Sequence, residues 1–318
     1  MTTTQFVSRM LFAAALTTFF SAPVFGEPAG AGEPIVVSGF QAPESVVHDR
    51  VMDWYLVSNV GLGNPAAFDH NGFISKVSPG GVVLDLAWIQ DGVGGVTLNG
   101  PKGLALRGDA LYVADVDTLR IFDRRTGALR RSVPMPNPFA PKPLFLNDVV
   151  VAGDGSVYLT DNRNSAIFEV DRKYRVRLLA SGPLLGGPNG IRLDSGSLSW
   201  VTFFGHEVKR LTRDGQLLTE ATLPVEDVSS LGLPPGALLL DGYARDEGDL
   251  LVSSWVSGKV FRIGRSGTDL ATIAEFVSAL DNPAHPDGPA DLAVDRQRHR
   301  LLIPLFNQNQ LVILSLRN

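Results

Sequence analysis

Cysteine is absent from the 318-residue chain. The protein therefore has no disulfide bond, no thiol nucleophile, no cysteine-ligated zinc and no lipid anchor attached through cysteine. Blocks of basic residues are also missing, and the net charge is −5 with a pI near 5.6. Neither nucleic acid nor an anionic membrane surface is expected as a partner. No segment after residue 26 is apolar enough for a transmembrane helix, so no membrane anchor is expected.

The first 26 residues have the organisation of an export signal. Arg9 supplies a positive charge, and residues 10–20 form an apolar run that is too short to span a bilayer of about 30 Å as a helix. A Pro-containing break then leads to Gly26, a small residue at a plausible cleavage point. A buried N-terminal helix is the alternative. We expect a signal peptide at residues 1–26, a periplasmic or secreted protein, and one domain at residues 27–318.

Six repeated segments follow. Each has a residue after Pro or Leu that is polar in five of the six, then a short aliphatic strand, a turn, a hydrophobic second strand and an alternating third strand. The polar positions lie 42 to 58 residues apart. This spacing predicts an all-β fold, a six-bladed β-propeller with four-stranded antiparallel blades. The last repeat stops after its third strand, at residues 311–316. We expect residues 35–38 to supply its outer strand and close the ring.

One position in each repeat, at the start of the first strand, is expected to lie at one mouth of the central channel. Four of these six residues carry side-chain oxygens, which suits Ca²⁺ with water or substrate completing its coordination, and another divalent cation is the alternative. Zinc fits less well, because no His or Cys is present. We call the six residues the anchors: Glu44, Lys102, Asn147, Asn189, Asp241 and Ala290.

A simpler interpretation treats Asn or Asp before Gly as a turn signal. It accounts for Asn189 and Asp241, which precede Gly190 and Gly242. It does not account for Glu44 or Asn147 at the equivalent positions. The sequence therefore favours a metal site over a set of turns.

The anchors also carry a family resemblance. Pro43-Glu44, Leu146-Asn147-Asp148, Pro188-Asn189-Gly190 and Leu240-Asp241-Gly242 resemble the motifs of the SMP-30/gluconolactonase/LRE family of calcium-dependent lactonase propellers, and more distantly those of paraoxonases. The resemblance covers about residues 35–318. It implies that Glu44, Asn147, Asn189 and Asp241 hold Ca²⁺ at the channel mouth, and that the substrate is a lactone or related ester.

Two residues depart from the family pattern. Phe145 stands where sugar-lactonase members commonly have Arg, which favours a more apolar substrate. Lys102 stands where paraoxonases have an active-site His. It could act as a base with a lowered pKa, contact a substrate anion, or form a salt bridge with Glu44 or Asp241 that replaces the metal.

The loops from second to third strands are expected to return to the anchor face. They place Asp161 and Asn162 where they could contact substrate or orient a ligand, and His206 where it could transfer a proton. The alternatives are a strand-end turn residue for Asp161 and a solvated loop residue for His206. Asp115, Trp255 and Asn307 are expected near the same entrance.

Three long loops, at residues 61–72, 88–100 and 134–143, are expected to form the pocket wall. Their neighbourhood supplies four aromatic side chains that would make this wall apolar: Phe68, Trp88, Phe139 and Phe145.

Together these features predict a calcium-dependent hydrolase. Water would attack a carbonyl polarised by the metal, with Asp241 or Glu44 as the base and Lys102 or His206 as alternatives. The rival prediction is a non-catalytic propeller that binds a small ligand or a protein. A strictosidine-synthase-like propeller would not need the four oxygen ligands. The metal content of the purified protein distinguishes the calcium-dependent hydrolase from the non-catalytic propeller.

Overall fold

The computed structural model describes residues 33–233, 236–284 and 286–316. The predicted signal peptide lies outside these residues. The described chain contains 24 β-strands and two short 3₁₀ helices, η1 (Pro183–Leu185) and η2 (Ser229–Leu231). Within it, no helix is long and apolar enough to cross a membrane.

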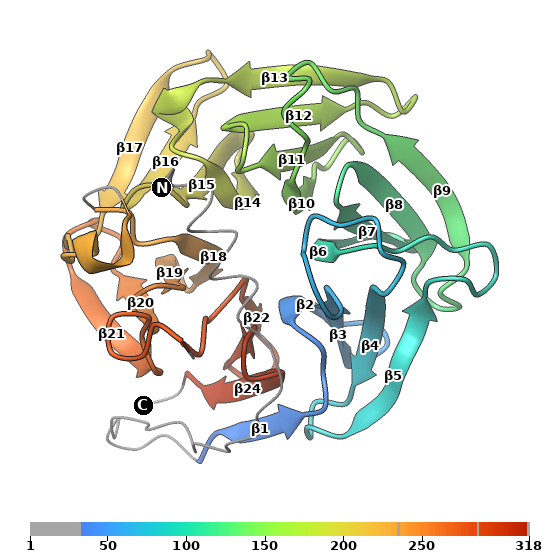
Figure 1. The fold of residues 1–318 in the computed structure, drawn as a ribbon, viewed down its shortest axis with the longest axis horizontal. Coiled ribbons are helices and arrows are strands. Elements are labelled where there is room, and N and C mark those ends of the chain that lie inside the picture. Colours follow the sequence, from blue (N-terminus) through green and yellow to red (C-terminus); the bar gives the residue numbers. More distant parts are fainter. Residues whose placement is uncertain (1–32, 234–235, 285, 317–318) are drawn as a thin grey trace.

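The strands form six four-stranded antiparallel sheets arranged around a central axis, which confirms the predicted propeller (Figure 1). The first three blades have the following strands. Blade 1 holds β2 (Pro43–Asp49), β3 (Trp54–Asn59), β4 (Phe73–Val77) and β5 (Val83–Gln90). Blade 2 holds β6 (Pro101–Arg107), β7 (Ala110–Asp115), β8 (Thr118–Asp123) and β9 (Leu129–Pro134). Blade 3 holds β10 (Leu146–Val151), β11 (Val157–Asp161), β12 (Ala166–Val170) and β13 (Val176–Ser181).

The remaining blades continue around the axis. Blade 4 holds β14 (Pro188–Asp194), β15 (Ser197–Thr202), β16 (Glu207–Leu211) and β17 (Leu217–Thr222). Blade 5 holds β18 (Leu240–Asp246), β19 (Asp249–Ser254), β20 (Lys259–Ile263) and β21 (Leu270–Glu275). Blade 6 holds β22 (Ala293–Asp295), β23 (Arg300–Leu305) and β24 (Gln310–Ser315), with β1 (Ile35–Ser38) as its outer strand.

The two ends of the chain close the ring as predicted. Strand β1 pairs antiparallel with β24, from Ile35 opposite Ile313 to Ser38 opposite Gln310. The outer strand of blade 6 thus precedes blade 1 in sequence, which joins the first and last blades. No seam remains between them.

Burial explains why the second strands read as continuous apolar runs rather than alternating ones. Each second strand is covered on both faces by neighbouring blades, so β3, β15 and β23 are almost fully buried. The fourth strands lie at the periphery and are largely exposed, as in β13 and β17. The core therefore consists of apolar layers between adjacent blades.

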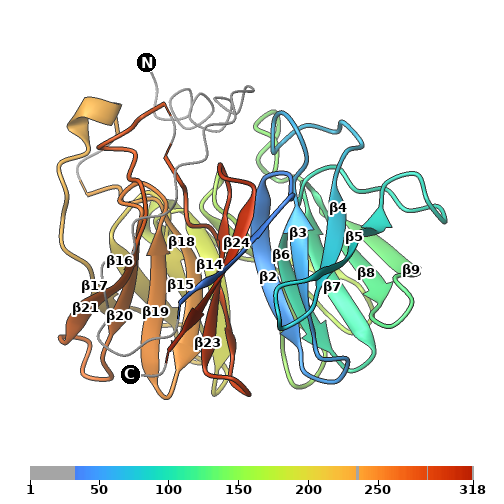
Figure 2. The same ribbon diagram turned by 90° about the horizontal axis from the view of Figure 1, so that it is seen from below.

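The two faces of the propeller differ in their connections. Figure 2 shows long loops on one face and short hairpins on the other. The long loops include the segments between β3 and β4, between β17 and β18, and between β21 and β22. The first strands begin at this face, so the anchors lie beneath the long loops.

Candidate active site

An irregularity in the first strand positions each of the first five anchors. In blades 1 to 5 the register between the first and second strands shifts at the anchor, for example between Pro43 and Val46 and between Leu240 and Tyr243. Such bulges redirect a side chain out of the regular pleat. In blades 1, 3 and 5, a hydroxyl of the second strand accepts the freed N–H of the residue after the anchor. The donors are the N–H groups of Ser45, Asp148 and Gly242, and the acceptors are Ser58, Thr160 and Ser253.

The glycines after the anchors serve close packing between blades. Asn189 and Asp241 lie inside strands β14 and β18, so the turn interpretation is wrong for them. A Cβ on Gly190 would stand 2.5 Å from the Asp241 carbonyl oxygen, and one on Gly242 would stand 2.6 Å from the Leu292 nitrogen. Only glycine permits this approach of neighbouring first strands. The anchors are thereby drawn together around the axis.

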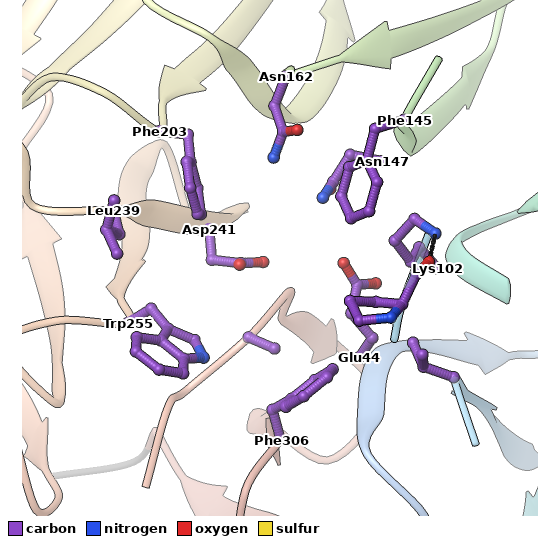
Figure 3. Close-up of a pocket in the computed structure, with 13 residues that line it drawn as sticks. Glu44, Lys102, Phe145, Asn147, Asn162, Phe203, Leu239, Asp241, Trp255 and Phe306 are labelled. Atoms are coloured by element: carbon purple, nitrogen blue, oxygen red, sulfur yellow. Dashed lines mark hydrogen bonds between the residues drawn. The ribbon is translucent and has the colours of Figure 1, made fainter. Parts of the chain in front are cut away.

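The four oxygen-bearing anchors are buried, and each has at least one side-chain oxygen without a hydrogen-bond partner. Glu44, Asn147 and Asp241 are each exposed by 6% or less, and Asn189 is fully buried. Figure 3 shows the carboxylates of Glu44 and Asp241 pointing toward the centre of the pocket. Buried polar groups are almost always paired, so four such groups at one place indicate a ligand-binding site. The atoms without a hydrogen-bond partner among the described residues are Glu44 Oε2, Asn147 Oδ1, Asn189 Oδ1 and Nδ2, and Asp241 Oδ1.

The two carboxylates have strongly perturbed acidity. Burial, reinforced by the nearby Asp241, raises the pKa of Glu44 well above its usual range. Burial and the neighbouring Asp291 likewise raise the pKa of Asp241, while the adjacent Asn189 amide opposes that rise. Both shifts mean that the protein alone does not compensate two negative charges at this place. A bound cation would do so.

The donor set fits a hard divalent cation. Carboxylate and amide oxygens are the ligands that Ca²⁺ prefers, and it takes 6–8 of them with water completing the set. The described residues contain no group of three or more His, Cys, Asp or Glu side chains suited to a metal ion. This is consistent with a set in which only Glu44 and Asp241 are of those types and Asn147 and Asn189 are amides.

Lys102 lies beside this set but does not pair with it. Its side chain is 1% exposed, and Nζ donates hydrogen bonds to the carbonyl oxygens of Gly100 at 2.7 Å and Pro65 at 3.2 Å. It also stands 4.6 Å from the centroid of the Phe145 ring. No salt bridge joins it to Glu44 or Asp241, in contrast to one of the sequence-based alternatives. Burial lowers the pKa of Lys102 to about 8, against the opposing effect of Glu44.

A second ring of residues forms the pocket wall above the anchors. Each member directly follows a second strand, so the same offset recurs in every blade. Five of the six line the pocket, Val116 being the exception, and Leu239 and Pro65 add to the wall (Figure 3). We call them the rim residues: Val60, Val116, Asn162, Phe203, Trp255 and Phe306. Sequence analysis placed only Asn162 and Trp255 at the entrance, although the repeat offset identifies the others.

The predicted wall of loop aromatics is largely wrong. Of the four, only Phe145 lines the pocket. Phe68 is exposed, and Phe139 packs edge-on against Phe168 within blade 3. Trp88 lies on the outer strand β5, near Trp54. Of the three predicted loops, only 61–72 lines the pocket, through Pro65, and much of the apolar lining comes from residues that follow the second strands.

The other predicted site residues are divided between pocket and surroundings. Phe145 and Asn162 line the pocket. Asp161 is fully buried behind it, where its carboxylate accepts hydrogen bonds from the Asn164 side chain and main chain. His206 lies in the loop between β15 and β16 and does not line this pocket. Its ring is close to Gly236 of the loop between β17 and β18. The structure thus brings Lys102 to the anchors and leaves His206 apart.

Two other residues predicted near the entrance have hydrogen-bond or ion-pair contacts with the surrounding chain. The Asp115 carboxylate accepts the N–H groups of Asn99 and Gly100 and pairs with Arg120 at 3.1 Å. The Asn307 amide donates to the Pro286 carbonyl. Both fix loops over the anchor face.

Comparison with known proteins supports the fold and leaves the function open. Neither protein-family models nor curated protein sequences match the chain. Among solved structures, a protein provisionally assigned as a gluconolactonase is similar at 16% identity with a TM-score of 0.62, covering 91% of this chain and 93% of that one. Virginiamycin B lyase from Staphylococcus aureus is similar at 13% identity with a TM-score of 0.55, covering 90% and 100%.

A nidogen/laminin complex is also similar, at 19% identity with a TM-score of 0.54, covering 73% of this chain and 80% of that one. These similarities show a shared fold, including that of the gluconolactonase-like propellers suggested by the motifs. The set contains enzymes and a protein–protein complex. Function must therefore be argued from the site itself.

Proposed function

We propose that this chain is a divalent-cation-dependent hydrolase of an apolar lactone or related ester. Ca²⁺ is the cation that best matches the oxygen set. One observation carries the proposal: Glu44, Asn147 and Asp241 bring unpaired oxygens into an aromatic-walled pocket, and the unpaired amide oxygen of Asn189 is buried beside Asp241. The gluconolactonase-like fold supports the same direction.

Held by these four residues, a divalent cation would polarise the substrate carbonyl and stabilise negative charge on its oxygen. The protein itself supplies position and exclusion of water. The cavity at the anchors has a volume of about 40 Å³. The reacting group of a substrate would lie there, with its apolar part against Phe203, Trp255 and Phe306.

Lys102 is the best-placed group for proton transfer. In its neutral form the amine has two N–H donors, which match the carbonyls of Gly100 and Pro65, and one lone pair that remains free. A pKa of about 8 leaves a fraction of neutral amine near neutral pH. The neutral amine would accept a proton from the attacking water, and the ammonium would return it to the leaving alkoxide. Asp241 and Glu44 are the alternative bases.

Two further residues would select the substrate. The Asn162 amide reaches the pocket and could donate a hydrogen bond to a substrate oxygen. Phe145 is held between Lys102 and Arg163, whose charged groups lie 4.6 and 4.7 Å from its ring centroid. An aromatic ring at this position favours apolar substrates over sugar acids.

The alternative is a non-catalytic propeller that binds a small ligand or a protein. The aromatic wall would serve a binder equally well, and the fold occurs in a nidogen/laminin complex. A binder needs no proton-transfer group, so the buried Lys102, which forms no salt bridge with the described residues, favours an enzyme.

The test begins with protein freed of metal by a chelator. Calorimetry with CaCl₂ should show one site, and a panel of aliphatic lactones and aryl esters should be hydrolysed only after Ca²⁺ is restored. Asp241→Asn should abolish calcium binding and hydrolysis. Asp109→Asn, a control at an exposed position, should change neither calcium binding nor hydrolysis. Hydrolysis that persists in both the chelator and Asp241→Asn would refute the proposal. Calcium binding without turnover of any ester would favour the binder.

A further inference from the structure

A second cavity opens at the opposite end of the channel, on the hairpin face. Its volume is about 290 Å³, which corresponds to roughly ten water molecules. Residues from the first strands of all six blades line it, below the level of the anchors. It is therefore as central as the candidate active site, but it belongs to the other mouth.

The charged groups of this cavity are mostly positive. Arg50, Arg192, Arg245 and Arg296 line it with His48, against only two carboxylates. Those carboxylates are already occupied. Asp148 accepts the N–H groups of Val149 and Ile191, and Asp291 accepts the Ser45 hydroxyl and the Leu292 N–H. An excess of guanidinium groups in a chain of net charge −5 is a local departure from its overall acidity.

Arg192 is the group that packing does not explain. It lies three residues after its anchor, and at that position the other blades have only small aliphatic residues: Val47, Ala105, Val150, Ala244 and Ala293. The residue is half-buried, and its Nε is buried without a hydrogen-bond partner. Asp291 lies close enough to interact with it electrostatically, but no carboxylate of the described residues forms a salt bridge with it. Burying the unpaired Nε–H destabilises the protein. Such a residue indicates a ligand.

Arg50 and Arg296 add positive charge at the outer edge of this cavity, where it opens to solvent. Both lie in exposed hairpins and neither has a carboxylate partner within the described residues; Arg296 donates only to the Arg245 carbonyl. Other arginines at this end are neutralised. Arg245 pairs with Asp194 and Glu220, and Arg298 pairs with Asp53 and Asp295.

His48 adds no free positive charge to the cavity. Its two ring nitrogens lie 3.3 Å from carboxylate oxygens of Asp53 and Asp295. The uncompensated charge therefore belongs to Arg50, Arg192 and Arg296, which come from blades 1, 4 and 6.

We propose that this arginine cavity binds a small multivalent oxyanion, either a phosphate or a compound with two or three carboxylates. Guanidinium groups bind both chemistries through paired N–H donors. The anion would pair with Arg192 in the channel and with Arg50 and Arg296 at the outer edge of the cavity. It would link blade 4 to the junction of blades 1 and 6. The site is separate from the candidate active site and does not depend on the proposed hydrolysis.

Calorimetry and thermal unfolding of the metal-free protein test the proposal. Inorganic phosphate and citrate are titrated separately, with NaCl at matched ionic strength as the control. At least one anion should bind and raise Tm beyond NaCl. Binding of phosphate alone assigns a phosphate ligand, and binding of citrate alone assigns a polycarboxylate. If neither anion exceeds NaCl, the proposal is wrong.

Variants separate a specific site from general charge. Arg192→Met keeps the aliphatic stem and should weaken anion binding at least about tenfold. The exposed Arg172→Met should leave it unchanged. The double variant Arg50→Met/Arg296→Met, at surface hairpins, should fold normally and also bind more weakly. If Arg192→Met does not fold, the double variant decides. Equal affinity in wild type and the cavity variants would overturn the assignment.

Discussion

The two ends of the central channel are built from the same six strands and have opposite chemistry. At one end Glu44, Asn147, Asn189 and Asp241 present unpaired oxygens. Three residues further along the strands, about 10 Å away, Arg192 presents an unpaired guanidinium among small aliphatic neighbours. The repeat fixes where side chains lie, and single substitutions within it decide what each end can bind.

The largest effect expected is on the oxygen end. Asp241→Asn keeps shape and removes one negative charge. We expect hydrolysis to fall by at least about 10²–10³-fold. The metal-free variant should unfold at the same temperature as wild type or higher, because a buried charge without a partner is removed. Steady-state kinetics measure the loss of hydrolysis, and scanning calorimetry measures the unfolding temperature. A variant that loses activity and stability together would instead indicate a structural Asp241.

The next effect concerns the scaffold that the two ends share. Gly242→Ala places a methyl group 2.6 Å from the Leu292 nitrogen, so blades 5 and 6 must separate. We expect a loss of about 3 kcal/mol in the free energy of unfolding, measured by urea denaturation. Gly153→Ala is the matched control, since nothing lies within 4 Å of its new Cβ. Similar losses in both variants would contradict the packing explanation.

Calcium should stabilise the protein in a pH-dependent manner. At 100 times Kd, binding adds about 2.7 kcal/mol to the free energy of unfolding. Because the pKa values of Glu44 and Asp241 are raised in the folded state, the metal-free fold loses stability as pH rises from about 4 through those values. Protons compete with Ca²⁺, so the increase in Tm should be larger at pH 8 than at pH 5.

The calcium prediction has a direct control. Glu44→Gln should weaken this pH dependence, and the exposed Glu275→Gln should retain it. A calcium effect independent of pH in the wild type would mean that these two carboxylates do not hold the ion.

The smallest effect is expected at Lys102, the positively charged side chain beside the oxygen-bearing anchors. Lys102→Met removes a positive charge that would repel Ca²⁺. Below pH 8 we expect several-fold tighter calcium binding, about 1 kcal/mol, together with slower hydrolysis. In the wild type the rate of hydrolysis should rise as the pH increases through about 8, the pKa of Lys102. This rise should be absent from the pH profile of the variant. Weaker calcium binding would show that Lys102 supports the site in another way.

The sequence predicted the fold well because repeats are local. Strand patterns, turn residues and blade spacing each recur within about 50 residues, and so the propeller, its closing strand and the anchors were all identifiable. The metal itself, export of the protein and its substrate stay predictions.

The wall was predicted less well because it depends on contacts between blades. Phe203 and Phe306 line the pocket because each directly follows a second strand, and neither lies in one of the three long loops. Arg192 shows the same limit. Its single departure from small aliphatic neighbours is visible in the aligned repeats, but only the packed channel shows that its Nε has no partner.

The pairing of β1 with β24 also sets the order in which the protein can form. Ile35 reaches its partner Ile313 only after nearly the whole chain has been synthesised. Contacts between such distant segments form slowly, and until then the outer edge of β24 is an open template for other strands. A form of the protein in which β1 has not yet paired with β24 therefore exposes an edge to which other strands can add. Its lifetime depends on how soon the first strand becomes free to join the last.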